Sequence, residues 1–100
     1  MLYLENNCIS KIEGLSKLKM LTCLYLHNNF ISEIENLEEC SELHTLNLSS
    51  NKIKTVENLE NLKKLEHLYL DRNLIENYES IKKLVECESL SCVFILFIVA

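Results

Sequence analysis

Proline and tryptophan are absent from the 100-residue chain, and Gly14 is its only glycine. Loops that cradle phosphate groups need several glycines, so the composition excludes a phosphate-binding loop of that kind. Basic residues are also few, because ten Lys and Arg stand against fifteen Asp and Glu, for a net charge of −5. Nucleic-acid binding needs clustered positive charge. The sequence therefore predicts no nucleic-acid partner.

Long apolar runs are missing as well. The longest, from Cys92 to Ala100, has nine residues, whereas a membrane-spanning helix needs about 20, so we expect no membrane insertion. The five cysteines are odd in number and form no C-x-x-C pair, and the first residues have no basic segment before an apolar run. These features favour reduced thiols and a cytoplasmic protein.

A fixed period of 22 residues organises what is present. It separates Leu21, Leu43 and Leu65, and it recurs through a second series formed by Leu4, Leu26, Leu48 and Leu70. Each unit follows the pattern L-x-x-L-x-L-x-x-N-x-I-x-x-I-E-x-L, and its length lies in the range of leucine-rich repeats. The sequence therefore predicts a solenoid in which each repeat covers its neighbours.

The two halves of each unit predict different structures. Leu46-Asn47-Leu48 alternates apolar and polar residues, as a short, half-buried strand does. Ile53, Val56, Leu59 and Leu62 are spaced by three, which suits a 3₁₀-like turn. We expect an α/β leucine-rich-repeat solenoid, with short parallel strands on a concave face and 3₁₀ or helical turns on a convex face.

Two polar positions recur in every unit. An asparagine follows each strand and is predicted to bond to neighbouring loop backbone as a structural ladder, formed by Asn7, Asn29, Asn51 and Asn73. An acidic residue precedes the convex turn and is expected to meet its exposed N–H groups, at Glu13, Glu35, Glu57 and Glu79. Cys40 takes the place of Leu18 and Leu62, so we expect a small buried side chain.

The end of the chain departs from the pattern. The fourth unit is 25 residues long, and Ile81, Leu84 and Val85 are spaced as on a helix that Ser80 could cap. We expect leucine-rich repeats over residues 1–92, including the start of a fifth unit, and a distinct apolar tail over 93–100. The favoured interpretation of this tail is a truncated or misread gene end, and the alternative is a closing buried strand with Val93 and Ile95 in phase.

Catalytic and metal-binding constellations are hard to assemble. Cys23 and His27 could form a nucleophile pair, but no third orienting group or oxyanion donor can be named. A zinc site at Cys87 and Cys92 lacks two further ligands. The sequence predicts a protein that is not an enzyme and holds no cofactor or metal.

The concave face is the remaining candidate site. Tyrosines share one row, broken only by Asn47, and Tyr, His and Arg side chains are typical of protein-binding hot spots. The candidate partner-binding residues are Tyr3, Tyr25, His27, Asn47, His67, Tyr69, Asp71 and Arg72. The alternative is that the aromatic side chains pack across strands and bind nothing.

The stretches "ISEIENL" and "IKTVENL" resemble the leucine-rich repeats with an I-x-x-I-E-N-L turn, which occur in a regulatory subunit of protein phosphatase 1 and in ciliary proteins. The order of "LYLENNCISKIEGL", "LTCLYLHNNFISEIENL" and "IKKLVECESL" is similar to the central repeats of the dynein axonemal assembly factor 1 family. The similarity runs from Leu2 to about Cys92 and ends before Phe94.

This resemblance implies a cytoplasmic scaffold, without catalysis, in a cell with cilia or flagella. Its partners would be dynein arm subunits, chaperones or co-chaperones during preassembly of the axonemal dynein arms. Two alternatives remain open: a regulatory subunit of protein phosphatase 1 with the same repeat type, and a structural component of the axoneme.

Overall fold

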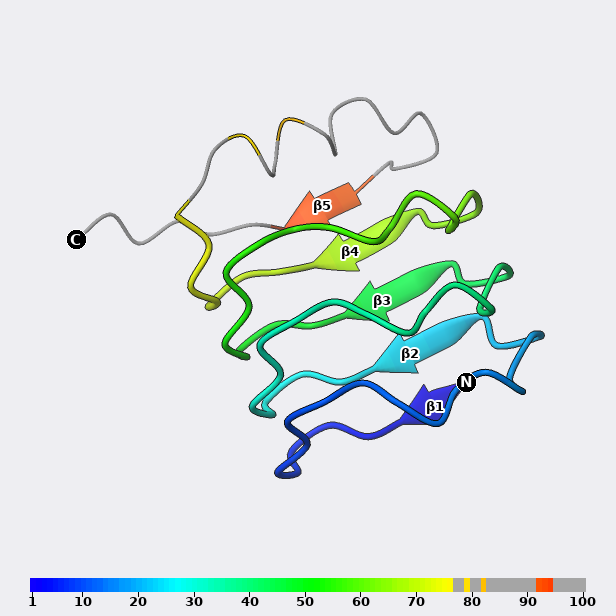
Figure 1. Cartoon of the computed structure of the whole chain (residues 1–100), viewed down its shortest axis with the longest axis horizontal. Helices are drawn as coiled ribbons and strands as arrows, with labels where there is room; N and C mark the ends of the chain where they lie inside the picture. The colour runs from blue at the N-terminus through cyan, green and yellow to red at the C-terminus, as the bar shows by residue number, and fades with distance from the viewer. Residues whose placement is uncertain (77–78, 80–81, 83–91, 95–100) are drawn as a thin grey trace.

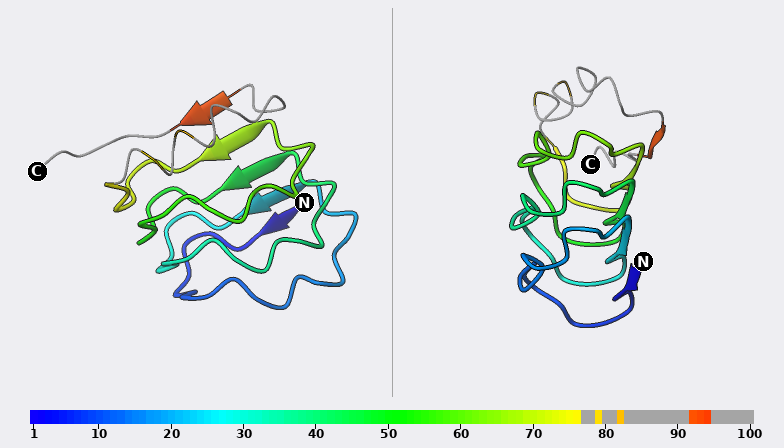
Figure 2. Two further views of the ribbon diagram at one scale, coloured as in Figure 1. Left: turned by 45° about the horizontal axis from the view of Figure 1, so that its top comes forward. Right: turned by 90° about the vertical axis from the view of Figure 1, so that its right-hand side faces the viewer.

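Five short strands form a single parallel sheet in the computed structural model, which describes residues 1–76, 79, 82 and 92–94. The strands lie side by side in chain order (Figure 1). They are β1 (Leu2–Tyr3), β2 (Cys23–Tyr25), β3 (Thr45–Asn47), β4 (His67–Tyr69) and β5 (Cys92–Phe94). The views in Figure 2 show the strands along one side of the stack and the connecting segments along the other. The expected parallel solenoid is confirmed.

The register of the sheet follows the repeat in the sequence. Leu2 pairs with Leu24, and Leu24 with Leu46, so partners differ by 22 positions. Leu68 pairs with Val93, a step of 25, which agrees with the phase expected for Val93. Of the expected helix at residues 80–85 the structure describes only Lys82, which is helical. The position of Ile95 lies outside the described residues, and the boundary between residues 92 and 93 stays a prediction.

Three residues after each of the strands β1 to β4, the backbone turns into the left-handed region. The φ angle is 59° at Asn6, 58° at Asn28, 57° at Ser50 and 57° at Arg72, positions that differ by 22. Asparagine tolerates this region better than most residues. The backbone N–H groups of Asn6, Asn28 and Ser50 still donate to carbonyl oxygens of the next unit, at 2.9 to 3.0 Å. The chain thus leaves the sheet at the same point in each repeat.

The core lies between the sheet and the connecting segments. The central residue of each inner strand is fully buried, at Leu24, Leu46 and Leu68, while its two neighbours are half-buried. Isoleucine and leucine from the second half of each unit meet these side chains from the opposite side. Burying a leucine or isoleucine side chain contributes about 1.5–3 kcal/mol. Cys40 is fully buried in this core, as expected from its position.

The convex side of residues 1–76 carries single turns, where the threefold spacing predicted 3₁₀ or helical turns. Hydrogen bonds from residue i+3 to residue i join Leu62 to Leu59 and Leu65 to Leu62, at 3.0 and 3.2 Å. The same pair of bonds occurs at Leu15–Leu18–Leu21 and at Leu37–Cys40–Leu43. Within residues 1–76 these bonds form single turns, and no helix is formed. The preceding segment, from Ile53 to Val56, contains no helical residue, and the Ile53 and Val56 side chains are buried in the core.

A second asparagine ladder runs along this side. The φ angles of Gly14, Asn36 and Asn58 are 77°, 58° and 61°. The amide of Asn36 donates to the carbonyl oxygen of Ile12, and that of Asn58 to Ile34, both at 2.7 Å. A side chain can therefore bond to the preceding unit while its backbone makes the left-handed turn.

Candidate functional site

The candidate site is the outer side of the sheet, which the sequence predicts to be concave and which we call the strand face. Strand register places Tyr3 beside Tyr25, Tyr25 beside Asn47, and Asn47 beside Tyr69. These four residues form one row across neighbouring strands, which we call the tyrosine row. Strand alternation places them on the outer side because the adjacent leucines point into the core, and Tyr3 is exposed while the other three are half-buried.

Two members of the tyrosine row stack on each other. The ring centroids of Tyr3 and Tyr25 lie 4.9 Å apart with an interplanar angle of 3°, and Tyr3 keeps 57% of its surface exposed. His27 meets Tyr25 edge-on, with centroids 6.4 Å apart at 86°. Partial burial, with smaller contributions from the Cys23 thiol and Tyr3, raises the pKa of Tyr25. The Tyr25 hydroxyl is therefore neutral at physiological pH.

Next to the tyrosine row lies a polar pair. The Ser49 hydroxyl donates to the carboxylate of Asp71, which lies 22 residues further along the chain, on the next unit. Asn47 Oδ1 accepts a hydrogen bond of 3.1 Å from the backbone N–H of Ser49. Arg72 is exposed and lies at the left-handed position after Asp71. Ser49 was not among the predicted site residues, and only its outward position in the repeat pointed to it.

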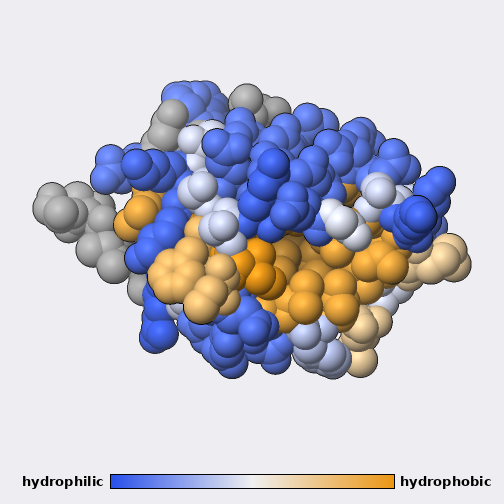
Figure 3. All heavy atoms as spheres, turned by 60° about the horizontal axis from the view of Figure 1, so that its bottom comes forward, coloured by the Kyte–Doolittle hydropathy of each residue, from blue (hydrophilic) through white to orange (hydrophobic). Residues whose placement is uncertain are grey.

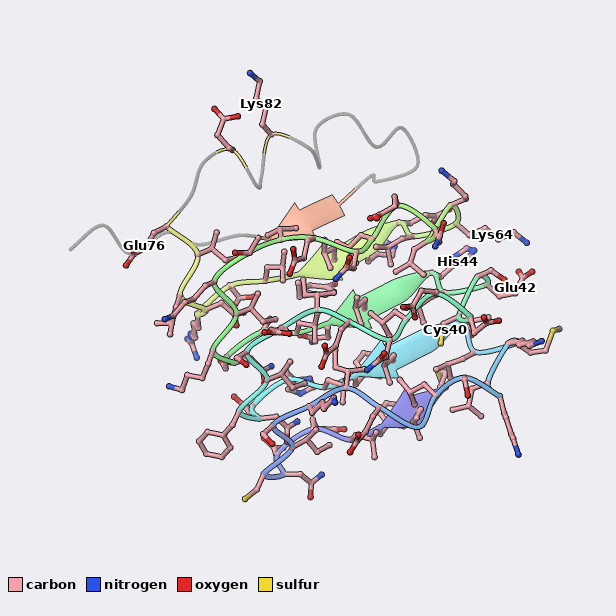
Figure 4. The ribbon with its side chains drawn as sticks, in the orientation of Figure 1. Cys40, Glu42, His44, Lys64, Glu76 and Lys82 are labelled. Carbon is pink, nitrogen blue, oxygen red and sulfur yellow. The ribbon has the colours of Figure 1, made fainter. Side chains whose placement is uncertain are left out.

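Two of the three histidines are neighbours through the backbone, since the N–H of His67 donates to the carbonyl oxygen of His44 at 3.0 Å. His67 is on β4, in register with Thr45 and Cys92. The Nδ1 atom of His27 is buried and has no hydrogen-bond partner among the described residues. His44 lies at the edge before β3 (Figure 4), where its Nδ1 atom is 3.7 Å from the carboxylate of Glu66. No group of three potential metal ligands occurs in the described part of the chain.

The edge that carries His44 also holds an ion pair between adjacent units. Lys64 Nζ lies 2.6 Å from Glu42 Oε2, and Figure 4 shows both side chains at this edge. The two side chains are 56% and 38% exposed. Exposed pairs of this kind contribute about 0–1 kcal/mol, so this edge adds little to stability.

The asparagines of the predicted ladder form hydrogen bonds with the backbone of their own unit and of the preceding unit. The amide nitrogen of Asn51 donates to Leu26 in the preceding unit, at 3.0 Å, and to Leu48 and Ser49 in its own. Its Oδ1 atom accepts from the backbone N–H of Ile31, also at 3.0 Å. Equivalent bonds link Asn29 to Leu4 and Ile9, and Asn73 to Leu48 and Ile53. The ladder fixes the strand-end loops and so holds the strand face in place.

Asn7 occupies the same repeat position without a unit before it in the structure. Its amide nitrogen donates only within its own unit, to the carbonyl oxygens of Leu4 and Glu5 at 3.0 and 3.1 Å. Asn7 is exposed, whereas Asn29 and Asn51 are buried. The ladder position thus becomes a buried, shared site only between two units.

The second ladder, at Asn36 and Asn58, was missed. The acidic residues beside it, Glu35 and Glu57, were expected to accept from N–H groups of the turn. The asparagine that follows each of them makes a different contact, because its side chain donates to a carbonyl oxygen of the preceding unit. Gly14 at the same repeat position was the available signal. Glycine and asparagine alternate only where the backbone has a positive φ.

Comparison with known proteins agrees with this geometry. A family described as "Leucine Rich repeats (2 copies)" matches residues 1–39 and 41–83. Internalin C2 from Listeria monocytogenes is 30% identical, with a TM-score of 0.82 over 94% of this chain. Internalin F from the same organism is also 30% identical, with a TM-score of 0.80 over 92% of this chain.

The chain spans 40% of the internalin C2 chain and 28% of the internalin F chain. No curated protein sequence matches it at a significant level. Among the residues that the structure describes, no helix is long and apolar enough to cross a membrane. The family match covers more than half of the chain, and the register, the ladder and the turns repeat with its period. This chain belongs to the leucine-rich repeat family.

Proposed function

We propose that the strand face is the surface with which this chain binds another protein. Leucine-rich repeats are typically protein-interaction scaffolds without catalysis. The observation that carries the proposal is the tyrosine row, in which Tyr3 and Tyr25 stack at 4.9 Å on a regular sheet. Large, nearly rigid aromatic side chains bury much area for little lost entropy, and they dominate many interfaces.

The scaffold is suited to binding without rearrangement. The inner strands β2, β3 and β4 are paired on both sides, and the loops after β2 and β3 are fixed by the asparagine ladder. A surface that is already ordered loses little conformational freedom on binding. Residues on several adjacent units can then contact one extended partner, as is typical of repeat proteins.

At a finer level, we propose a role in cytoplasmic preassembly of axonemal dynein arms, and hence in the assembly and motility of cilia or flagella. Support comes from the resemblance of the repeats between Leu2 and Cys92 to the dynein axonemal assembly factor 1 family. Dynein arm subunits and chaperones or co-chaperones are the proposed partners. The protein would act in the cytoplasm and at the cilium or flagellum.

A capture experiment tests both levels. The purified 100-residue chain is immobilised, exposed to extract from ciliated cells, and its partners are identified by mass spectrometry. We expect dynein arm subunits or their chaperones, and we expect Tyr25→Ala/Tyr69→Ala to lose them while circular dichroism stays unchanged. Lys52→Ala/Lys54→Ala, at exposed positions in the loop after β3, is the matched control that should keep them.

Other outcomes would redirect the proposal. Recovery of protein phosphatase 1 would favour the regulatory-subunit alternative, and recovery of assembled axonemal tubulin would favour a structural component. If the double tyrosine variant captures the same partners as the unchanged chain, binding does not use the strand face, and the proposal fails.

A further inference from the structure

The tyrosine row has one interruption, at Asn47. Neighbouring strands of a sheet lie about 4.8 Å apart, and the rings of Tyr3 and Tyr25 are separated by nearly the same distance, 4.9 Å. Tyr25 and Tyr69 stand two strands apart, on either side of Asn47. Their positions are therefore about 9.6 Å apart, twice the strand spacing. One planar group placed between them would continue the stacking distance already present in the row.

Asn47 places no ring in this interval, because its side chain is short and hydrogen-bonded along its own strand. Its Oδ1 atom accepts the hydrogen bond of 3.1 Å from the N–H of Ser49, two residues further on. A tyrosine at the same position would place a ring in the row, as in the units on either side. We call the space between the positions of Tyr25 and Tyr69, above Asn47, the Asn47 interval.

A carboxylate borders the Asn47 interval. The Ser49 hydroxyl, two residues beyond Asn47 on the same face, holds the Asp71 carboxylate toward the β3 side. Asp71 takes part in neither of the two ion pairs described above, Lys64–Glu42 and His44–Glu66. The chain as a whole carries a net charge of −5. The Asn47 interval thus combines aromatic walls with a nearby negative charge.

These features select among planar groups. The faces of tyrosine rings are electronegative and attract cations, and the guanidinium group stacks on them while donating hydrogen bonds to a carboxylate. A neutral aromatic ring would match the walls but would leave the carboxylate uncompensated beside it. A lysine would match the charge but lacks a planar group to fill the interval.

We propose that the Asn47 interval receives an arginine side chain of the partner protein, with its guanidinium between Tyr25 and Tyr69 and the Asp71 carboxylate as its counter-charge. This proposal rests on the proposed protein-binding role of the strand face and names the residue type that the partner presents there. The partner segment must be exposed and must carry arginine where it crosses β3.

Short peptides test the proposal directly. The probes are four acetylated, amidated pentapeptides of the form Gly-Gly-X-Gly-Gly, in which X is arginine, citrulline, lysine or phenylalanine. Binding is followed by NMR through the ring resonances of Tyr25 and Tyr69. We expect the arginine peptide to bind at least about fivefold more tightly than the other three, which corresponds to one cation–π contact of about 1 kcal/mol.

Two variants separate the walls from the charge. Asn47→Tyr fills the interval with a residue that the row already accepts elsewhere, so we expect the arginine peptide to lose its advantage while the fold persists. Asp71→Asn keeps an acceptor for Ser49 and removes the counter-charge, so we expect the advantage of arginine over citrulline to shrink to the part that the cation–π contact supplies. Lys52→Ala should bind all four peptides as the unchanged chain does.

The proposal is overturned if citrulline, lysine or phenylalanine binds as tightly as arginine to the unchanged chain. Undiminished arginine binding by Asn47→Tyr would overturn it equally. If Tyr25→Ala/Tyr69→Ala abolishes partner capture but Asn47→Tyr captures the same partner with unchanged affinity, the arginine proposal fails and the binding role of the strand face stands. If the double tyrosine variant leaves capture unchanged, the binding role itself fails.

Discussion

The first unit and the central units carry equivalent residues at equivalent positions, yet these residues are buried to different extents. Leu18 is 40% exposed, whereas Cys40 and Leu62, at the same repeat position, are 0% and 4% exposed. Leu2 is half-buried, while Leu24 and Leu46, at the same position in the next two units, are fully buried. Figure 3 shows apolar residues spread over the outer side of the first unit. The repeat pattern therefore determines which side chains point toward the core, but the adjacent units determine how deeply these side chains are buried.

The polar contacts follow the same rule. Asn7 bonds within its own unit, whereas Asn51 also reaches the unit before it and accepts from Ile31. A stack of such units gains stability from its interfaces as much as from each unit alone. The following comparisons between equivalent positions should reveal this difference, beginning with the largest expected effect.

Removing a core leucine should cost most in a central unit. Leu46→Ala leaves a cavity in a fully buried site, so we expect a loss of about 2–5 kcal/mol in the free energy of unfolding. Leu2→Ala, at the equivalent but half-buried position, should cost about 1 kcal/mol. Urea unfolding followed by circular dichroism measures both. Equal losses would mean that neighbouring units do not determine the burial energy.

Replacing a ladder asparagine should show the next largest contrast. Asn51→Leu strands the Ile31 N–H and backbone carbonyls of two units, and each unsatisfied buried group costs about 1–3 kcal/mol. We expect a loss of at least about 2 kcal/mol, against about 0.5 kcal/mol for Asn7→Leu at an exposed site. An unchanged urea midpoint for Asn51→Leu would refute the structural role of the ladder.

The second ladder combines two effects that substitutions can separate. Asn58→Ala loses the bond of 2.7 Å to Ile34 and places alanine at a φ of 61°, so we expect a loss of about 1–2 kcal/mol. Glycine adopts a positive φ readily, so Asn58→Gly should lose only the hydrogen bond to Ile34. Gly14→Ala meets no atom within 4 Å of the added Cβ and isolates the backbone strain. If Asn58→Gly is as stable as the unchanged chain, the bond contributes nothing.

The reactivity of the cysteine thiols should differ between the first unit, which holds Cys8, and the second unit, which holds Cys40. This comparison needs no substitution. Cys8 is exposed, whereas Cys40 is buried and its Sγ atom lies 3.9 Å from the carbonyl oxygen of Leu15. Burial, with smaller effects of Glu38 and Glu39, raises the pKa of the Cys40 thiol, so less reactive thiolate is present at a given pH. At pH 8, iodoacetamide should modify Cys8 promptly and Cys40 only after unfolding. Equal modification in the folded chain, quantified by mass spectrometry, would contradict the burial of Cys40.

The regular parts of the molecule could be predicted from sequence because each depends on a spacing. The 22-residue period predicted the parallel order and the register, since residues such as Leu24 and Leu46 must point into one core. The position of Asn51 after a strand predicted its bonds to neighbouring backbone. Alternation along the strands also placed Tyr25 and Tyr69 in one row with Asn47 between them.

Other features could not be obtained from spacing. A threefold apolar period is compatible with a 3₁₀ helix and with extended chain joined by single turns, and the structure has the latter between Ile53 and Leu65. Glu57 and Asn58 are adjacent, and the positive φ of Asn58 is what lets its side chain bond to Ile34. Composition does not encode that backbone angle. The contact between Ser49 and Asp71 depends on side-chain rotamers across two units. Partner identity depends on a molecule outside this chain.

Hydrogen exchange at three equivalent amides tests the central claim, that neighbouring units stabilise each repeat, most directly. The N–H groups of Leu4, Leu26 and Leu48 donate to Tyr25, Asn47 and Tyr69 at 2.8, 2.8 and 2.9 Å, so their local geometry is the same. We predict slow exchange at Leu26 and Leu48 and exchange at least about tenfold faster at Leu4, because opening the first unit disrupts one interface instead of two. Equal protection at all three amides, measured by NMR at native pH, would contradict the account.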